Sequence, residues 1–130
     1  MPVEVENTGR ACLLGHEPAG SARRTFVADQ PAAVIVDSFG CLSSECTTDL
    51  LASCEVQMDG TALTITTHAS WNDTTRVTGI CTDDCVGPHA ECETPPLPAA
   101  TYSVRIGTGP AITLDVPSMP EVVPCLGDEL

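Results

Sequence analysis

The stretch that decides the fold runs from residue 54 to residue 71 and reads CEVQMDGTALTITTHASW. In its first half, a polar residue follows each of the apolar residues Cys54, Val56 and Met58. Asp59-Gly60 comes next, a pair that is typical of a type I′ turn between two antiparallel strands. Alternation with a period of two on both sides of such a turn predicts a β-hairpin.

The register of this hairpin follows from taking Asp59 and Gly60 as the two loop residues. It pairs Met58 with Thr61, Val56 with Leu63, and Cys54 with Ile65. The apolar partners then share one face of the hairpin, which is the arrangement that allows one buried and one wet face. The opposite face carries Glu55, Thr64, Thr66 and His68.

A second hairpin is expected near the end of the chain. Apolar residues alternate with polar ones over 100–106, the sequence Gly-Thr-Gly-Pro at 107–110 predicts a turn, and the alternation resumes over 112–116. Pairing Val104 with Leu114 places the apolar residues of both strands on one face.

Shorter strands are expected elsewhere, at Val3–Glu6, Cys12–Leu14, Thr25–Ala28, Val34–Val36, Arg76–Thr78 and Ala90–Glu93. Many short strands separated by turn residues predict an all-β fold, namely a disulfide-stapled antiparallel β-sandwich of Ig-like type, with a small β-barrel as the alternative. The length of 130 residues suits a single domain over 1–130. The segments 1–10 and 117–130 are expected to be extended.

The eight cysteines predict a disulfide framework. An even number of cysteines without Cys-x2-Cys spacing is typical of proteins that fold in an oxidising compartment. The expected disulfide cysteines are Cys12, Cys41, Cys46, Cys54, Cys81, Cys85, Cys92 and Cys125. Many connectivities are possible, and we favour Cys12–Cys125, Cys54–Cys92, Cys41–Cys46 and Cys81–Cys85.

Charge and hydropathy exclude several classes of protein. The chain has 18 acidic residues, five basic residues that are all Arg, and a formal net charge of −13. Such a chain lacks the clustered cations that track a phosphate backbone, so no nucleic-acid partner is expected. The longest apolar run, Ala32–Val36, is far too short to span a bilayer, so no membrane span is expected either.

Cysteine usage also predicts the location of the protein. Disulfides indicate a secreted, periplasmic or outer-surface protein, although the sequence opens without the charged start and apolar stretch of a signal peptide. We therefore expect a mature chain from which an export signal has been removed.

A calcium site is one interpretation of the acidic residues. Asp83, Asp84 and Glu91 could supply oxygen ligands to Ca²⁺, although the alternating pattern of an EF-hand is absent. The competing interpretation is a solvated acidic surface, which we favour. The segment from Cys81 to His89 lacks the spacing of zinc or haem sites, so no cofactor is expected.

Catalytic patterns are missing from the sequence. None of His16, His68 and His89 lies in a metal-binding or nucleophile motif, and no Gly-x-Ser-x-Gly sequence or Gly-rich phosphate loop occurs. We expect no catalytic residues and no enzymatic activity. Trp71 falls on the predicted buried face and is expected to fill the core or its edge, the alternative being a platform for a sugar ring.

The segment Leu97–Arg105, which reads LPAATYSVR, resembles the "L-P-x-G-T-Y-x-V" motif that leads into the last hairpin of secreted bacterial Ig-like modules. Ala100 stands where these modules have Gly. Together with the spacing of the cysteines, the chain over about 40–117 resembles small cysteine-rich lipoproteins and secreted proteins. The resemblance implies a non-catalytic surface module with Tyr102 at a sheet corner, and it implies no active site.

Three functions are consistent with these features. The first is a secreted or cell-surface β-sandwich module that binds a protein or glycan partner or gives structural support. The second is a self-assembling subunit of an extracellular fibre, with the terminal segments adding strands to a neighbour. The third is an extracellular protease inhibitor that presents the loop Cys41–Cys54 to a hydrolase.

Overall fold

The computed structural model describes residues 2–15, 25–37, 46–73 and 89–128, and every regular element within these ranges is a β-strand. The nine strands of this described part are β1 (Pro2–Glu6), β2 (Gly9–Leu14), β3 (Ala33–Asp37), β4 (Thr47–Asp59), β5 (Ala62–Asp73), β6 (Ala90–Glu93), β7 (Ala100–Ile106), β8 (Ile112–Val116) and β9 (Cys125–Asp128). The predicted all-β fold is confirmed. No helix in the described ranges has the length and apolar character needed to cross a membrane.

The strands form two open sheets. In the five-stranded sheet, called the large sheet, β4 pairs with one edge of β5, while β1 and β7 pair with the other edge and β8 follows β7. The four-stranded sheet, called the small sheet, has the order β6-β3-β2-β9. Neither sheet closes on itself, so the protein is a sandwich and the barrel alternative is wrong.

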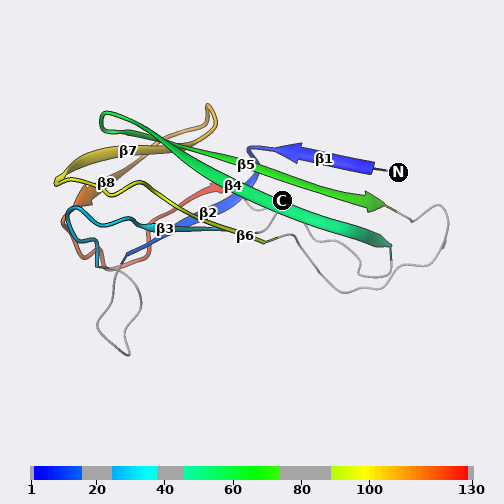
Figure 1. Cartoon of the computed structure of the whole chain (residues 1–130), viewed down its shortest axis with the longest axis horizontal. Coiled ribbons are helices and arrows are strands. Elements are labelled where there is room, and N and C mark those ends of the chain that lie inside the picture. The colour runs from blue at the N-terminus through cyan, green and yellow to red at the C-terminus, as the bar shows by residue number, and fades with distance from the viewer. Residues whose placement is uncertain (1, 16–24, 38–45, 74–88, 129–130) are drawn as a thin grey trace.

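The hairpin β4–β5 contains the two longest strands and extends along most of the length of the large sheet (Figure 1). At one end of this hairpin β7 lies beside residues 62–65 of β5, and at the other end β1 lies beside residues 68–72. The β5–β7 pair is parallel, whereas every other strand pair in the described ranges is antiparallel.

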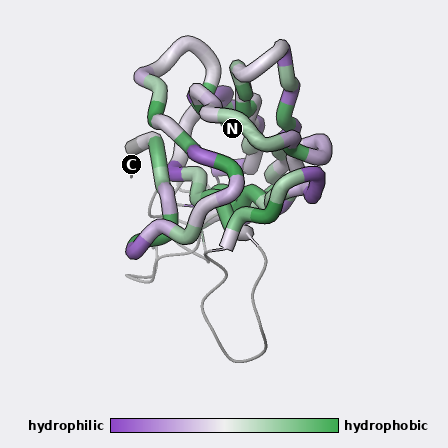
Figure 2. The backbone as a smooth tube through the Cα atoms, turned by 90° about the vertical axis from the view of Figure 1, so that its left-hand side faces the viewer, coloured by the Kyte–Doolittle hydropathy of each residue, from purple (hydrophilic) through white to green (hydrophobic). Residues whose placement is uncertain are grey.

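The core lies between the two sheets because the strands bury alternate residues. Figure 2 shows hydrophobic and hydrophilic residues alternating along the backbone. Each sheet contributes aliphatic side chains that are no more than 7% exposed. Those of the large sheet include Leu63, Ile65, Val104, Leu114 and Val116, and those of the small sheet include Ala11, Leu13, Val34, Val36 and Leu126.

The predicted first hairpin exists, but its predicted register is wrong by two residues. Val56 lies opposite Ile65 instead of Leu63, and the loop residues are Gly60 and Thr61 instead of Asp59 and Gly60. Of the two loop residues only Gly60 has a positive φ, 61°, which is the pattern of a type II′ turn with Gly in its first central position. A shift of two residues preserves the faces, so the predicted buried side is correct.

The second hairpin also exists with a register that differs from the prediction. Val104 lies opposite Ile112, whereas Leu114 lies opposite Tyr102. The turn is closed by a hydrogen bond from Gly109 N to the Ile106 carbonyl at 2.9 Å. Pro110, which follows, has no N–H to donate to the opposite strand. The two strands therefore begin to pair only at Ile112.

Most of the shorter predicted strands are present: Ala90–Glu93 has the predicted bounds, and β1, β2 and β3 differ from their predicted bounds by one to three residues. The exceptions are Thr25–Ala28, which is not a strand, and Arg76–Thr78, which lies outside the described residues. Phe26 forms an isolated bridge with Ser118, and the chain then turns at Asp29, where φ is 65°. Near the termini, β1 pairs with β5 and β9 pairs with β2 within the same chain.

Candidate functional site

The predicted disulfides come first among the residues singled out by the sequence. Cys12–Cys125 and Cys54–Cys92 are both formed as predicted, with Cα–Cα distances of 4.1 Å and 5.8 Å. The first joins neighbouring strands of the small sheet, and the second joins β4 of the large sheet to β6 of the small one. Cys46 is also disulfide-bonded. Cys41, Cys81 and Cys85 lie outside the described residues, so their pairing stays a prediction.

The calcium interpretation is not tested by the structure. Asp83 and Asp84 lie outside the described residues, and Glu91 is exposed on β6. No group of three potential metal-binding side chains occurs among the residues that the structure describes.

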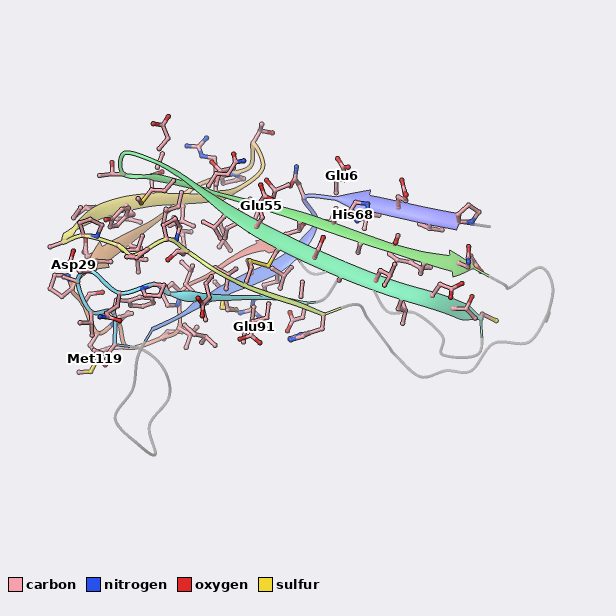
Figure 3. All side chains as sticks on the ribbon, in the orientation of Figure 1. Glu6, Asp29, Glu55, His68, Glu91 and Met119 are labelled. Carbon is pink, nitrogen blue, oxygen red and sulfur yellow. A yellow bond between two sulfur atoms is a disulfide. The ribbon has the colours of Figure 1, made fainter. Side chains whose placement is uncertain are left out.

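Two of the three histidines, His68 and His89, lie within the described residues. His68 is half-buried on the outer face of the large sheet, in register with Glu6 of β1 and Ser53 of β4 (Figure 3). His89 is exposed, and His16 lies outside the described residues.

Trp71 is half-buried and packs against the hydrophobic core, as predicted for an aromatic residue at the edge of the core. Tyr102 is 2% exposed, and its hydroxyl donates a hydrogen bond to the carbonyl of Pro98, four residues upstream. The ring of Tyr102 is therefore not a solvent-facing platform. Trp71 also lines a surface pocket with Leu51 and Asn72, so its role as a platform for a sugar ring stays an alternative.

A different place on the molecule has the properties of a binding site. Along the edge of β5 that faces away from β4, the neighbouring strand changes from β7 to β1 between Ile65 and Thr67. The Ile65 carbonyl accepts a hydrogen bond from Gly107 N of the β7–β8 turn at 2.9 Å. The Thr67 carbonyl accepts one from Asn7 N of the β1–β2 turn, also at 2.9 Å. The two turns are thereby brought side by side, although about 100 residues of sequence separate them.

The end of β9 completes a concave site at these two turns. We call this site the end cavity; it has a volume of about 190 Å³ and is lined by Asn7, Thr8, Gly9, Ile106, Gly109, Pro110, Leu126 and Gly127. An apolar cavity of about 150 Å³ is large enough to admit a benzene ring. The end cavity can therefore hold one aliphatic or aromatic group.

Glycine at two positions allows β2 and β9 to approach each other beside the end cavity. Gly127 has φ 94°, and a Cβ atom added to it would lie 2.3 Å from the Gly9 carbonyl oxygen and 2.9 Å from Ile106 Cδ1. Gly9 itself has φ 89°. Any side chain at Gly127 would therefore clash with its surroundings.

Asn7 holds the β1–β2 turn in a left-handed conformation, with φ 53°. Its side-chain oxygen accepts a hydrogen bond from Thr67 N at 3.2 Å, and the Thr67 hydroxyl donates to the Thr8 carbonyl at 3.0 Å. Asn tolerates positive φ better than other non-glycine residues. These bonds fix the position of the next residue, Thr8, in the wall of the end cavity.

Thr8 presents the polar group of this site. Its Oγ1 atom is buried and has no hydrogen-bond partner among the described residues. A buried polar group without a partner costs about 1–3 kcal/mol, and such groups are rare in folded proteins. The end cavity thus has mostly apolar walls, and one of its lining residues, Thr8, carries a buried hydroxyl without a partner among the described residues.

Sequence reasoning missed the end cavity. Asn-Thr-Gly at 7–9 and Gly-Thr-Gly-Pro at 107–110 can each be recognised as turns, and the second was predicted as one. Nothing in either segment indicates that the two turns meet, because their contact depends on both β1 and β7 pairing with the same edge of β5.

Comparisons with known proteins add no family to this description: no protein-family model, no curated protein and no solved structure matches the chain.

Proposed function

We propose that the protein is a non-catalytic, exported β-sandwich module that binds another protein by accepting one apolar side chain into the end cavity. The observation that carries this proposal is the end cavity, a concave site of about 190 Å³ with mostly apolar walls, beside which the buried Thr8 hydroxyl has no partner among the described residues. The Thr8 side chain would turn its hydroxyl toward the end cavity on binding, where a peptide group next to the inserted side chain would supply the missing hydrogen bond. The disulfides support export, since such bonds persist in oxidising compartments.

A protein partner fits the site better than a glycan. The lining combines apolar side chains with backbone, and none of its residues is charged or aromatic. Sugar-binding sites depend on aromatic faces and several polar groups, whereas an apolar pocket for a single side chain is a common anchor in protein recognition.

Two other functions are less well supported. A fibre built by exchange of terminal strands would first have to break the β1–β5 and β2–β9 ladders, and Cys12–Cys125 holds β9 in place. The inhibitor hypothesis depends on the loop Cys41–Cys54, of which residues 41–45 lie outside the described residues.

The proposal is tested by titrating ¹⁵N-labelled protein with N-acetyl-leucine amide, which joins an aliphatic side chain to peptide groups. We expect NMR shift changes centred on Thr8, Gly109 and Gly127, and weaker changes with N-acetyl-alanine amide, which fills less of the cavity. Shift changes that are absent or spread over the whole surface at the solubility limit would overturn the proposal.

The variant Thr8→Val tests the role of the hydroxyl. Valine has nearly the same shape, so we expect the free energy of unfolding to stay the same or rise by about 1 kcal/mol as an unpaired buried hydroxyl disappears. Binding of N-acetyl-leucine amide should weaken at the same time. Thr66→Val, the same change on the exposed outer face of the large sheet, is the control and should leave binding intact. A loss of stability in Thr8→Val would show that the hydroxyl already has a partner.

A further inference from the structure

β9 is an edge strand of the small sheet (red in Figure 1). In the described part of the chain it pairs with β2 alone, and no other strand of that sheet lies beyond it. The edges of β4 and β6 are different, because these two strands lie beside each other and are joined by Cys54–Cys92. β9 also forms part of the end cavity, which Leu126 and Gly127 line. The site of the proposed function therefore adjoins an unpaired sheet edge.

The backbone groups that β9 presents outward follow from its pairing with β2. The Pro124 carbonyl accepts a hydrogen bond from Leu13 N at 2.8 Å, so it points toward β2. The C=O and N–H of one trans peptide point in opposite directions, so the N–H of Cys125 points away from β2. Hydrogen-bonded pairs recur at every second position of an antiparallel ladder, and Ala11 and Leu126 form the next such pair.

Three outward groups result from this pattern. The N–H and C=O of Cys125 and the N–H of Gly127 point to the outer edge of β9. None of the three has a hydrogen-bond partner among the described residues. Gly127 is exposed and has no side chain, so another backbone can approach this edge closely. Cys12–Cys125 holds β9 to β2, so the edge keeps its position.

The side chains of β9 place the end cavity in line with this edge. Leu126 is 7% exposed and packs into the core between the two sheets, where it lines the end cavity. A strand added to β9 would show the same alternation of faces, so its residue opposite Leu126 would direct its side chain toward the end cavity. The residues before and after it would lie opposite Gly127 and Cys125 and would bond to their backbone groups.

We infer that the partner segment binds in an extended conformation, as an antiparallel strand added to β9, with an aliphatic side chain in the end cavity. This inference rests on the proposed function, since it states how the partner of the end cavity lies on the protein. Antiparallel pairing is the more stable arrangement per residue, and strand addition commonly combines backbone hydrogen bonds with a pocket for a side chain. A neutral segment fits this site, because no charged residue lines the end cavity. The net charge of −13 disfavours a second copy of this chain as the occupant.

The direct test is amide hydrogen exchange of the full disulfide-bonded chain, with and without the neutral peptide N-acetyl-Ser-Thr-Leu-Thr-Ser-amide. In the free protein, the amides of Cys125 and Gly127 should exchange quickly, while that of Leu126 should be protected by β2. The peptide should slow exchange at Cys125 and Gly127. Absence of this protection at saturating peptide, or protection that grows with protein concentration when no peptide is present, would overturn the inference.

Thr113 of β8 provides an internal control on the edge of the other sheet. It lies opposite Ser103, whose N–H donates to the Thr61 carbonyl on the side of β5, so the backbone groups of Thr113 face away from β7. Its amide should exchange quickly both with and without the peptide. Equal slowing at Thr113 and at Gly127 would show that the peptide pairs with any sheet edge, which contradicts a site at β9.

Two methylated peptides separate strand addition from insertion of the side chain alone. In the antiparallel strand, the N–H of the Thr that follows Leu donates to the Cys125 carbonyl, whereas the N–H of Leu points away from β9. N-methylation of that Thr should weaken binding about tenfold, since one hydrogen bond is lost. N-methylation of Leu is the matched control and should leave the affinity nearly unchanged. Equal affinities of the two methylated peptides would contradict the antiparallel strand.

N-acetyl-leucine amide distinguishes failure of this inference from failure of the proposed function. It carries the side chain for the end cavity but lacks the carbonyl that would accept from Cys125 N, so that amide should still exchange quickly. The longer peptide should bind about tenfold more tightly through the added hydrogen bonds. If N-acetyl-leucine amide binds and the peptide binds no more tightly, the inference fails and the proposed function stands. If N-acetyl-leucine amide does not bind at the end cavity, the proposed function fails and the inference with it.

Discussion

At the scale of single residues, glycine decides how closely two strands of the small sheet approach each other. Gly127 of β9 has φ 94°, in a region that L side chains rarely adopt, and the Gly9 carbonyl stands where its Cβ would be. Gly60 in the β4–β5 turn has φ 61°, but nothing lies within 4 Å of a Cβ added there. The two glycines share the backbone requirement and differ in the space around them.

This difference predicts unequal effects of alanine. Gly60→Ala should lower the free energy of unfolding by about 1–2 kcal/mol, because only the left-handed conformation is penalised. Gly127→Ala adds a clash with backbone and should cost at least about 3 kcal/mol. Urea denaturation measures both values. Equal losses would show that β9 moves away from β2 without cost.

A second residue with a distinct environment is Tyr102. Burial, with a smaller contribution from the negative charge of Asp29, raises the pKa of its phenol above the ordinary value. The neutral form is thus favoured in the folded state. The unfolded chain loses the proton first as pH rises, so stability declines above the unfolded pKa of about 10 and is fully present below it.

The corresponding prediction concerns alkaline pH. The free energy of unfolding should be nearly level from pH 8 to about pH 10 and should fall at higher pH, as measured by urea denaturation at each pH. Because the chain has one Tyr and no Lys, few other groups titrate in this range. Tyr102→Phe should be less stable at pH 8, through loss of the bond to Pro98, but should show a flatter decline. An equal decline of the free energy of unfolding in both proteins would show that groups other than Tyr102 cause it.

At the scale of elements, the two described disulfides constrain different parts of the sandwich. Cys12–Cys125 connects register partners in adjacent strands and closes a separation of 113 residues. Cys54–Cys92 connects an edge strand of each sheet over a separation of 38 residues. Restriction of the unfolded chain grows slowly with loop length, so the longer loop gives the larger stabilisation.

We therefore predict that both double-alanine variants are less stable, in a defined order. Replacing Cys12 and Cys125 should cost about 5 kcal/mol, and replacing Cys54 and Cys92 about 4 kcal/mol. Chemical denaturation of the purified variants gives the values. The reverse order would indicate that holding the two sheets together contributes more than restricting the unfolded chain. Mapping of peptides without reduction should find no free thiol.

At the scale of the whole molecule, a small core is combined with a strongly negative surface. Leu, Ile, Val and Phe make up 29 of 130 residues, and the net charge is −13. Charge of one sign destabilises the compact state through mutual repulsion, and salt screens it over about 10 Å at 0.1 M ionic strength.

Raising NaCl should therefore raise the melting temperature. A gain of about 1 kcal/mol corresponds to roughly 4 °C for a domain of this size. Choline chloride at the same ionic strength should act equally if screening is the cause. A melting temperature that is independent of both salts would contradict the repulsion argument, and an effect of NaCl alone would indicate a specific sodium site.

The parts of the fold that could be predicted are those encoded over short distances. Alternation around Gly60 predicted a hairpin with the correct buried face, but the choice between loops 59–60 and 60–61 depends on the twist of the paired strands. Cys54–Cys92 was also predicted, as a link between two expected strands. The end cavity was not predicted, because Thr8 and Ile106 are 98 residues apart.

The amino-acid sequence by itself determined an all-β chain with one buried face per strand, an acidic surface, and disulfides in place of a large core. These properties depend on side-chain type and on spacing of a few residues, which local patterns record directly. Only the tertiary structure decided that β5 pairs with β7 and then with β1 along one edge, and with β4 along the other. The end cavity follows from that pairing, because any strand with free backbone groups can pair with an edge, and competition among distant strands decides which one does.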